Sequence, residues 1–336
     1  MEKSGNPKSL CSRATADNFV DQQTNWYDQI LGKYGGTWYS DQLLRSILSA
    51  RSNFKAKEGD VMVTSLPKSG TTWLLALTFS IAKRSLIPPG QSPLLTANPH
   101  DLACNLEFKL YWEEDNPNLD GIPCPRIFST HVPHVMLPDS VRESDNCRII
   151  YICRNPLDRF ISLRHFLLAN RVVKEAAAPP PPLAMDEAFN EFCQGIEMYG
   201  PFWEHVLGYW KEHLENPRKL LFLHYEEMKE DPVGHVRKIA EFLGCPFTAE
   251  EEKQGMVDEI SRLCSFESMK NMEANKEGYV YKQFKKTSFF REGKVHNWSN
   301  YLSPTIAKGM EKVIEAKFKG SGLNMKTRFQ IDKEMN

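Results

Sequence analysis

Residues 68–72 (Lys-Ser-Gly-Thr-Thr) bring an ammonium group, three hydroxyl groups and a glycine into one short stretch of the chain. The apolar residues 61–63 before them predict the end of a buried strand, and the apolar spacing that begins at Thr71 predicts a helix. Pro67 fixes φ and Gly70 permits strained angles, so residues 65–70 are expected to form a tight loop. Backbone N–H groups and the positive end of the helix dipole then converge on one point, which suits a phosphate or a sulfate.

This stretch differs from the Walker loop of kinases and nucleotide triphosphatases. The Walker motif places its lysine directly after its second glycine, whereas Lys68 precedes Gly70 and no glycine stands five residues before it. A kinase or a nucleotide triphosphatase is therefore disfavoured. For the bare pattern, the alternative is an ordinary strand–loop–helix turn that carries an isolated lysine.

The composition is that of a globular protein without an overall basic surface. The 336 residues carry a net charge of −1, with 41% hydrophobic and 25% charged residues, so that no general excess of basic charge favours nucleic acid or an anionic membrane. The eight cysteines form no C-x-x-C pair, so we expect no metal site. We expect them to be reduced thiols. The chain starts without an apolar signal segment and contains no run of about 20 apolar residues, which predicts a cytoplasmic protein.

Buried strands alternate with helices along the chain. We expect strands at 126–129, 147–153 and 219–224, and helices at 41–50, 232–243 and 304–318, with a helical centre at 104–112 and a long helical region at 185–214. The pattern predicts the α/β class, with a central, mostly parallel sheet flanked by helices and a P-loop-like anion loop. A single domain is expected over residues 21–325, with a disordered tail at 1–20, a Pro-rich surface insertion at 176–182 and a polar tail at 326–336.

Two further chemical groups follow predicted strands. His131 stands at the carboxyl end of one strand, where ligands bind in open parallel sheets and where an imidazole can act as a general base. A structural role for His131 is the alternative, and His134 competes for the catalytic role. Arg154 follows the next strand and could hold a phosphate, or could instead pair with a carboxylate, and Ser162 comes about two turns into the following helix.

The hexapeptide Lys-Ser-Gly-Thr-Thr-Trp resembles the 5′-phosphosulfate loop of the cytosolic sulfotransferases. The segments FSTHVPHVMLP, YGPFWEHVLGYWKE and FLHYEEMKEDP are similar to plant members of that family, and the resemblance extends from about Gly35 to Phe318. It implies transfer of a sulfuryl group from 3′-phosphoadenosine 5′-phosphosulfate (PAPS) to a hydroxyl group of a small molecule, without a metal ion.

The resemblance also implies a role for individual residues. His131 would be the general base, and Lys68 would stabilise the charge on the leaving phosphate oxygen. The implied PAPS-binding residues are Lys68, Ser69, Gly70, Thr71 and Thr72 at the 5′-phosphosulfate, Trp73, Tyr225, Cys264 and Phe266 at the adenine, and Arg154, Ser162, Arg291, Glu292 and Gly293 at the 3′-phosphate.

The chain departs from the family pattern at several of these positions. Cys264 replaces a threonine, Glu292 replaces the lysine of an Arg-Lys-Gly motif, and residues 296–298 (His-Asn-Trp) replace Gly-Asp-Trp. Ser129 stands where animal members have a lysine. Glu292 and the His-Asn-Trp change leave open a catalytically degenerate protein that binds PAPS or its product PAP (3′-phosphoadenosine 5′-phosphate) without turnover. A kinase-like phosphoryl transferase is the third hypothesis, after the active sulfotransferase and the degenerate nucleotide-binding protein.

The acceptor is less defined than the nucleotide site. Aromatic residues could form a flat apolar pocket, although core packing would require the same residues; the candidates are Trp38, Tyr39, Tyr111, Phe166 and Phe202. The resemblance implies a phenolic or flavonoid, steroidal or hormone-like alcohol as acceptor. A K-x-x-x-T-V-x-x-x-E dimerisation element is not found, so we expect a monomer, with a homodimer as the alternative.

Overall fold

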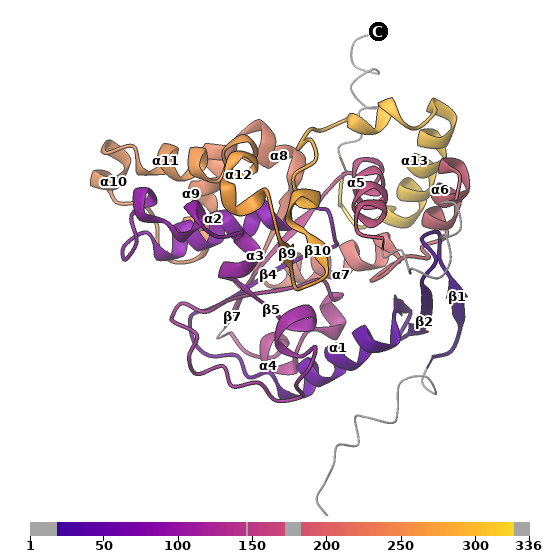
Figure 1. The fold of residues 1–336 in the computed structure, drawn as a ribbon, viewed down its shortest axis with the longest axis horizontal. Coiled ribbons are helices and arrows are strands. Elements are labelled where there is room, and N and C mark those ends of the chain that lie inside the picture. Colours follow the sequence, from indigo (N-terminus) through magenta and orange to yellow (C-terminus); the bar gives the residue numbers. More distant parts are fainter. Residues whose placement is uncertain (1–18, 146, 172–182, 326–336) are drawn as a thin grey trace, which may run out of the picture.

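The computed structural model describes residues 19–145, 147–171 and 183–325 (Figure 1). The predicted insertion at 176–182, the tail at 326–336 and the first 18 residues of the N-terminal tail lie outside this range. Residues 19 and 20 are described, and the backbone N–H of Val20 donates a hydrogen bond to the carbonyl of Lys33 at 3.0 Å.

A five-stranded parallel sheet forms the centre of the molecule, in the order β5-β6-β4-β7-β8. Its strands are β4 (Asp60–Ser65), β5 (Cys104–Asn105), β6 (Ile127–Thr130), β7 (Cys147–Cys153) and β8 (Leu220–His224). Because the strands are parallel, their carboxyl ends meet at one edge, directly before the loops that begin with Leu66, His131 and Arg154. This arrangement confirms the predicted α/β class.

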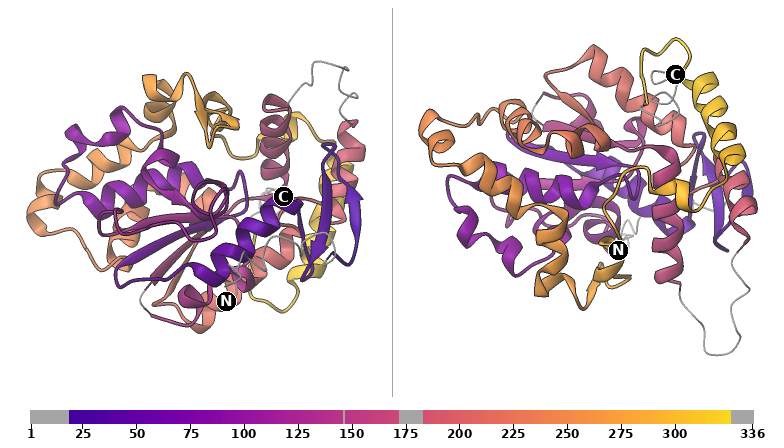
Figure 2. Two further views of the ribbon diagram at one scale, coloured as in Figure 1. Left: turned by 60° about the horizontal axis from the view of Figure 1, so that its bottom comes forward. Right: turned by 90° about the horizontal axis from the view of Figure 1, so that it is seen from above.

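Helices cover both faces of the sheet, since the side chains of a strand alternate between its two faces (Figures 1 and 2). On β7, Ile150 and Ile152 belong to a core shared with helices α2 (Thr71–Lys83), α9 (Pro232–Phe242) and α11 (Met256–Leu263). Ile149 and Tyr151 belong to a larger core shared with helices α1 (Asp41–Asn53), α5 (Pro156–Ala169), α7 (Phe202–Glu215) and α13 (Pro304–Phe318). The near-continuous apolar strands seen in the sequence are explained by this burial on both faces.

The helices and the smaller sheets have the following bounds. The helices are α1 (Asp41–Asn53), α2 (Thr71–Lys83), α3 (Pro99–Leu102), α4 (Asp139–Arg142), α5 (Pro156–Ala169), α6 (Met185–Cys193), α7 (Phe202–Glu215), α8 (Tyr225–Glu230), α9 (Pro232–Phe242), α10 (Ala249–Lys253), α11 (Met256–Leu263), α12 (Phe266–Asn271) and α13 (Pro304–Phe318). Two antiparallel sheets are formed by β1 (Gln22–Thr24), β2 (Ile30–Tyr34) and β3 (Thr37–Tyr39), and by β9 (Tyr279–Val280) and β10 (Phe284–Lys285). None of the helices in the described ranges combines the length and apolarity that crossing a bilayer requires.

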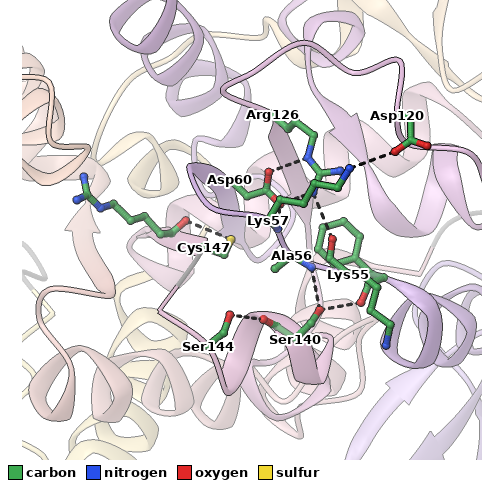
Figure 3. A network of polar contacts seen from close by, with 11 residues as sticks. Lys55, Ala56, Lys57, Asp60, Asp120, Arg126, Ser140, Ser144 and Cys147 are labelled. Carbon is green, nitrogen blue, oxygen red and sulfur yellow. Dashed lines mark hydrogen bonds and ion pairs between the residues drawn. The ribbon is translucent and has the colours of Figure 1, made fainter.

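A buried ion pair anchors the amino-terminal end of the sheet (Figure 3). Asp60, at the start of β4, accepts two hydrogen bonds from the Arg126 guanidinium, with N–O distances of 2.7 and 2.5 Å, and both side chains are almost fully buried. Asp60 also accepts from the backbone N–H of Lys57 at 2.7 Å. These contacts hold β4 and β6 together at the end opposite the loops that carry the candidate chemistry.

Two helix predictions are wrong. The region 185–214 is not one helix but α6 and α7, separated by residues 194–201, where Gly195 has a φ of +80° and Pro201 is the N-cap of the second helix. The predicted helical centre at 104–112 begins instead with the short strand β5, and a single π-helical turn (Leu106–Leu110) follows it. The strand β5 arises from pairing with β6, which local apolar spacing does not encode.

Candidate active site

One large cavity, of about 370 Å³, opens at the carboxyl ends of the central strands. It is lined by the loop before α2, by the first turn of α2, by residues 162–167 of α5, and by residues between 281 and 293 in the segment before α13. Most of the predicted site residues line it: Lys68, Gly70, Thr71, Thr72, Trp73, His131, Arg154, Ser162, Tyr225, Phe266, Arg291, Glu292 and Gly293.

The loop before α2 has the strained backbone that an anion cradle requires. Gly70 caps α2 with a φ of +112°, and a Cβ at that position would lie 2.8 Å from the Tyr225 ring. Lys68 also adopts a positive φ of +70°, which is unusual for a residue with a side chain. The Ser65 and Thr71 hydroxyls are 2.6 Å apart and tie the end of β4 to the start of α2. The first N–H groups of α2, which have no partners within the helix, are therefore presented at the cavity.

Lys68 lies in an apolar and cationic environment. Its Nζ donates to the Ser288 carbonyl at 3.3 Å and stands 4.1 Å from the centre of the Phe166 ring. Burial, together with the nearby charges of Arg154 and Arg291, lowers the pKa of the ammonium group from 10.5 to about 7. A bound anion would offset both effects.

Two guanidinium groups complete the cationic end of the cavity. The Arg154 Nη atoms donate to the carbonyls of Lys68 at 3.3 Å and Lys294 at 2.9 Å, and the group lies 4.6 Å from the centre of the Tyr225 ring. Within the described part of the chain, the buried Nε atoms of both Arg154 and Arg291 have no hydrogen-bond partner. Such unsatisfied cationic donors fit an anionic ligand.

Glu292 contacts the neighbouring cations. Its carboxylate lies 3.0 Å from Nη1 of Arg291 and 3.9 Å from Nζ of Lys294. In the orientation that satisfies both amide atoms, the Asn297 side chain accepts from Arg291 at 3.0 Å and donates to Glu292 at 3.2 Å. Glu292 and Asn297, two of the positions at which the chain departs from the family pattern, therefore contact each other.

His131 is held by three hydrogen bonds, one to its ring and two to its backbone, and a fourth holds the backbone of the next residue. Its Nδ1 is 2.7 Å from the Ser65 carbonyl, and because a carbonyl can only accept, Nδ1 carries the proton and Nε2 keeps a free lone pair. The backbone N–H donates to Glu107 at 2.6 Å, His205 donates to the backbone carbonyl at 2.9 Å, and Tyr209 donates to the next carbonyl, that of Val132, at 2.7 Å. Burial, with the nearby charges of Arg159 and Lys68, lowers the pKa of His131 to about 4, so that the ring is neutral at pH 7.

His134 is separate from this site. It does not line the cavity, and its Nε2 lies 3.7 Å from the Glu212 carboxylate, beside the Tyr209 ring. The sequence offered both His131 and His134 as candidates for the general base, and of these two only His131 lines the cavity.

Comparison with known proteins identifies the family. The protein-family model of the sulfotransferase domain matches residues 58–322 of this chain. The chain belongs to the sulfotransferase family. It is 41% identical to cytosolic sulfotransferase 15 of Arabidopsis thaliana over 91% of this chain and 85% of that protein, and 44% identical to cytosolic sulfotransferase 14 over 84% and 82%. It is therefore a sulfotransferase of the cytosolic plant type, an enzyme, as the sequence predicted.

Solved structures support the same assignment. An Arabidopsis thaliana protein provisionally described as a steroid sulphotransferase superposes with a TM-score of 0.73 at 36% identity, covering 94% of this chain and 95% of that one. A mouse sulfotransferase solved in complex with PAP superposes with a TM-score of 0.68 at 31% identity, covering 87% and 95%.

Ser69 and Cys264 are the two predicted nucleotide-binding residues whose side chains do not line the cavity of this sulfotransferase. Ser69 is buried within the loop. Cys264 is fully buried, with Sγ 3.4 Å from the Ser80 hydroxyl, because Val257, Ile260 and Cys264 share the core-facing stripe of α11 and its end. Ser261 and Ser265, on the adjacent stripe, line the cavity instead, and helical spacing could have indicated them.

The acceptor end of the cavity is aromatic and was largely missed. Of the five aromatic residues proposed from the sequence only Phe166 lines it; Trp38, Tyr39, Tyr111 and Phe202 are buried elsewhere. The residues that form this wall are Tyr27, Phe108, Trp112, Met198, Tyr199, Tyr281, Phe284 and Phe289.

His100 is a further polar residue of the cavity that the sequence did not single out. Its Nε2 is 2.9 Å from the Thr72 hydroxyl in the first turn of α2, and its Nδ1 is 3.2 Å from the Tyr281 hydroxyl on the aromatic wall. Burial lowers the pKa of His100 to about 3, so it adds no charge to the site at neutral pH. Within the described residues, no cluster of three or more His, Cys, Asp or Glu side chains is arranged to hold a metal ion.

Proposed function

We propose that this sulfotransferase transfers the sulfuryl group of PAPS to a hydroxyl group of a small, uncharged and largely aromatic or steroidal acceptor. The observation that carries the proposal is the convergence of Lys68, Arg154 and Arg291 on the same cavity as a neutral His131 whose Nε2 can accept a proton. The cations suit the two phosphate positions of PAPS, and His131 suits a hydroxyl acceptor.

In the proposed reaction, the acceptor oxygen attacks sulfur while His131 Nε2 takes the hydroxyl proton. The new bond joins that oxygen to sulfur, and the bond between sulfur and the bridging phosphate oxygen breaks, which releases PAP. Lys68 and the N–H groups at the start of α2 stabilise the negative charge that builds on the bridging oxygen. The chain thus contributes positioning and electrostatics, as in phosphoryl transfer.

The charge of the lining residues supports a neutral acceptor. Among the described residues that line the cavity, the charged side chains are Lys68, Arg154, Lys229, Arg291 and Glu292. Lys229 stands 6.0 Å from the centre of the Trp73 ring, and the others lie around the anion loop. The aromatic wall offers only neutral polar groups such as Gln29, Ser40 and Gln283, which favours an uncharged phenol or alcohol over an amine cation.

The roles of Trp73, Tyr225 and Phe266 at the adenine, and of Ser162 at the 3′-phosphate, are part of this proposal. Trp73 and Tyr225 meet edge to face with ring centres 5.7 Å apart, and both line the cavity with Phe266. Because the curated relatives are named cytosolic sulfotransferases, we also propose a cytosolic location. A monomeric state stays a prediction from the sequence.

Calorimetric titration with PAP, beside AMP as the control, tests the nucleotide site first. Micromolar binding of PAP with a strong preference over AMP supports a working 3′-phosphate site. Turnover is then measured as PAP release from PAPS with a panel of neutral phenols, flavonoids and steroid alcohols. PAP binding without turnover on any of these acceptors would favour the degenerate alternative, and absence of PAP binding would refute the proposal.

A further inference from the structure

A fully buried ion pair lies directly behind the cavity. Arg159, on α5, and Glu197, in the segment between α6 and α7, both have no exposed side-chain surface. Their two hydrogen bonds are parallel, with N–O distances of 2.9 and 2.8 Å. Neither side chain lines the cavity, so the pair makes no direct contact with a substrate.

Arg159 also reaches the anion loop. Its Nε donates to the carbonyl of Pro67 at 3.0 Å, and Pro67 immediately precedes Lys68. Lys68 is the loop residue with the strained φ of +70°. The Arg159 hydrogen bond therefore fixes the peptide that sets the direction of the Lys68 side chain.

Glu197 connects the same guanidinium to the acceptor wall. The next two residues are Met198 and Tyr199, and both line the cavity. The Tyr199 hydroxyl donates to Glu107 at 3.2 Å, and the same Glu107 oxygen accepts the backbone N–H of His131. A continuous set of contacts thus leads from the peptide before Lys68 to the backbone of His131.

We propose that Arg159 and Glu197 are a positioning pair that holds the anion loop and the acceptor wall in register, so that Lys68 and His131 act on the same bond. The alternative is a purely structural pair. A buried ion pair is weak evidence of stabilisation by itself, because two apolar side chains of similar volume can often replace it. Arg159, however, uses its fork to bind Glu197 and its third N–H to bind Pro67, and an apolar replacement cannot supply that third bond.

The test uses the double variant R159M/E197M, because removing one partner alone would leave a buried charge and could prevent folding. The control is D60L/R126M, which removes the buried ion pair at the opposite end of β4. Binding of PAP is compared with binding of adenosine 3′-monophosphate, which lacks the 5′-phosphate that the loop would hold. This design rests on the proposed use of PAPS.

A positioning role predicts that folded R159M/E197M binds PAP at least about tenfold more weakly while adenosine 3′-monophosphate affinity is unchanged, and that kcat falls by about tenfold or more. The control D60L/R126M should keep the wild-type ratio of the two affinities and the wild-type kcat. If R159M/E197M is folded and keeps both wild-type values, or if it loses affinity for both nucleotides equally, the positioning role is refuted. Wild-type protein that binds neither nucleotide would instead refute the proposed function, and the loop's role with it.

Discussion

Raising the pH from 7 to 9 should weaken PAP binding by neutralising Lys68. Burial and the charges of Arg154 and Arg291 lower the pKa of this lysine to about 7 in the free protein. A bound 5′-phosphate favours the ammonium form and raises the pKa again, so that binding takes up a proton. If the bound lysine stays charged, the protonated fraction of the free protein falls from about one half to about one hundredth, and PAP affinity falls roughly 50-fold.

The same titration affects the free energy of unfolding with a defined sign. The lysine binds a proton more weakly in the folded protein than in the unfolded chain, so the free protein gains stability as pH rises from about 7 towards 10.5. The gain is lost as pH falls to about 7. The rise in Tm that PAP causes should therefore shrink between pH 7 and pH 9.

Calorimetry in two buffers of different ionisation enthalpy measures the proton uptake directly. The expected uptake is about half a proton at pH 7 and close to one proton at pH 8.5. Because the second pKa of a phosphate monoester is about 6, the ligand adds little above pH 7. Lys68→Met is the control: it should bind PAP weakly and without this pH dependence. Equal pH dependence in the wild type and Lys68→Met would refute the reasoning.

Three further substitutions separate the roles within the cavity. His131→Ala should lower kcat by about 10²- to 10⁴-fold while PAP affinity stays unchanged, and a variant that keeps the wild-type rate would exclude His131 as the base. Arg154→Ala should weaken PAP by about 10- to 100-fold and AMP far less; equal losses for both ligands would contradict the 3′-phosphate role. Cys264→Thr should leave PAP affinity unchanged, because this side chain is buried against Ser80 and does not line the cavity; tighter binding would show that position 264 does reach the nucleotide.

The sequence predicted the fold wherever strand and helix signals are local. The predicted bounds of β7 and α13 agree with the structure, since a run of apolar residues or an apolar stripe between clear breakers marks each of them. The short strand β5 was missed because two residues become a strand only by pairing with β6. The break between α6 and α7 was missed because apolar spacing continues across it, although Gly195 and Pro201 were a readable signal.

The nucleotide end of the cavity was predictable because short contiguous motifs form it. The loop before α2 follows β4 directly, Arg154 follows β7 directly, and Ser162 lies on the helix that comes next in the chain. The acceptor wall combines single residues from distant segments, such as Tyr27, Met198 and Tyr281. Aromatic content could not separate this wall from the core, and nothing local indicated that Arg159 would meet Glu197, 38 positions away.

The departures at Glu292 and Asn297 contact each other in the structure and should be tested together. With the family residues, lysine at 292 and aspartate at 297 would form an ion pair at this contact; here a carboxylate accepts from an amide at 3.2 Å. E292K alone places an ammonium group beside Arg291 without an anion, and N297D alone places two carboxylates together, so each single change should reduce stability. The double variant E292K/N297D should recover part of both losses, with a coupling free energy of about 0.5–3 kcal/mol in the double-mutant cycle. Thermal unfolding and PAP titration of the four proteins measure this coupling; additive effects would show that Glu292 and Asn297 act independently, and that Glu292 alone reduces the positive charge at the 3′-phosphate site.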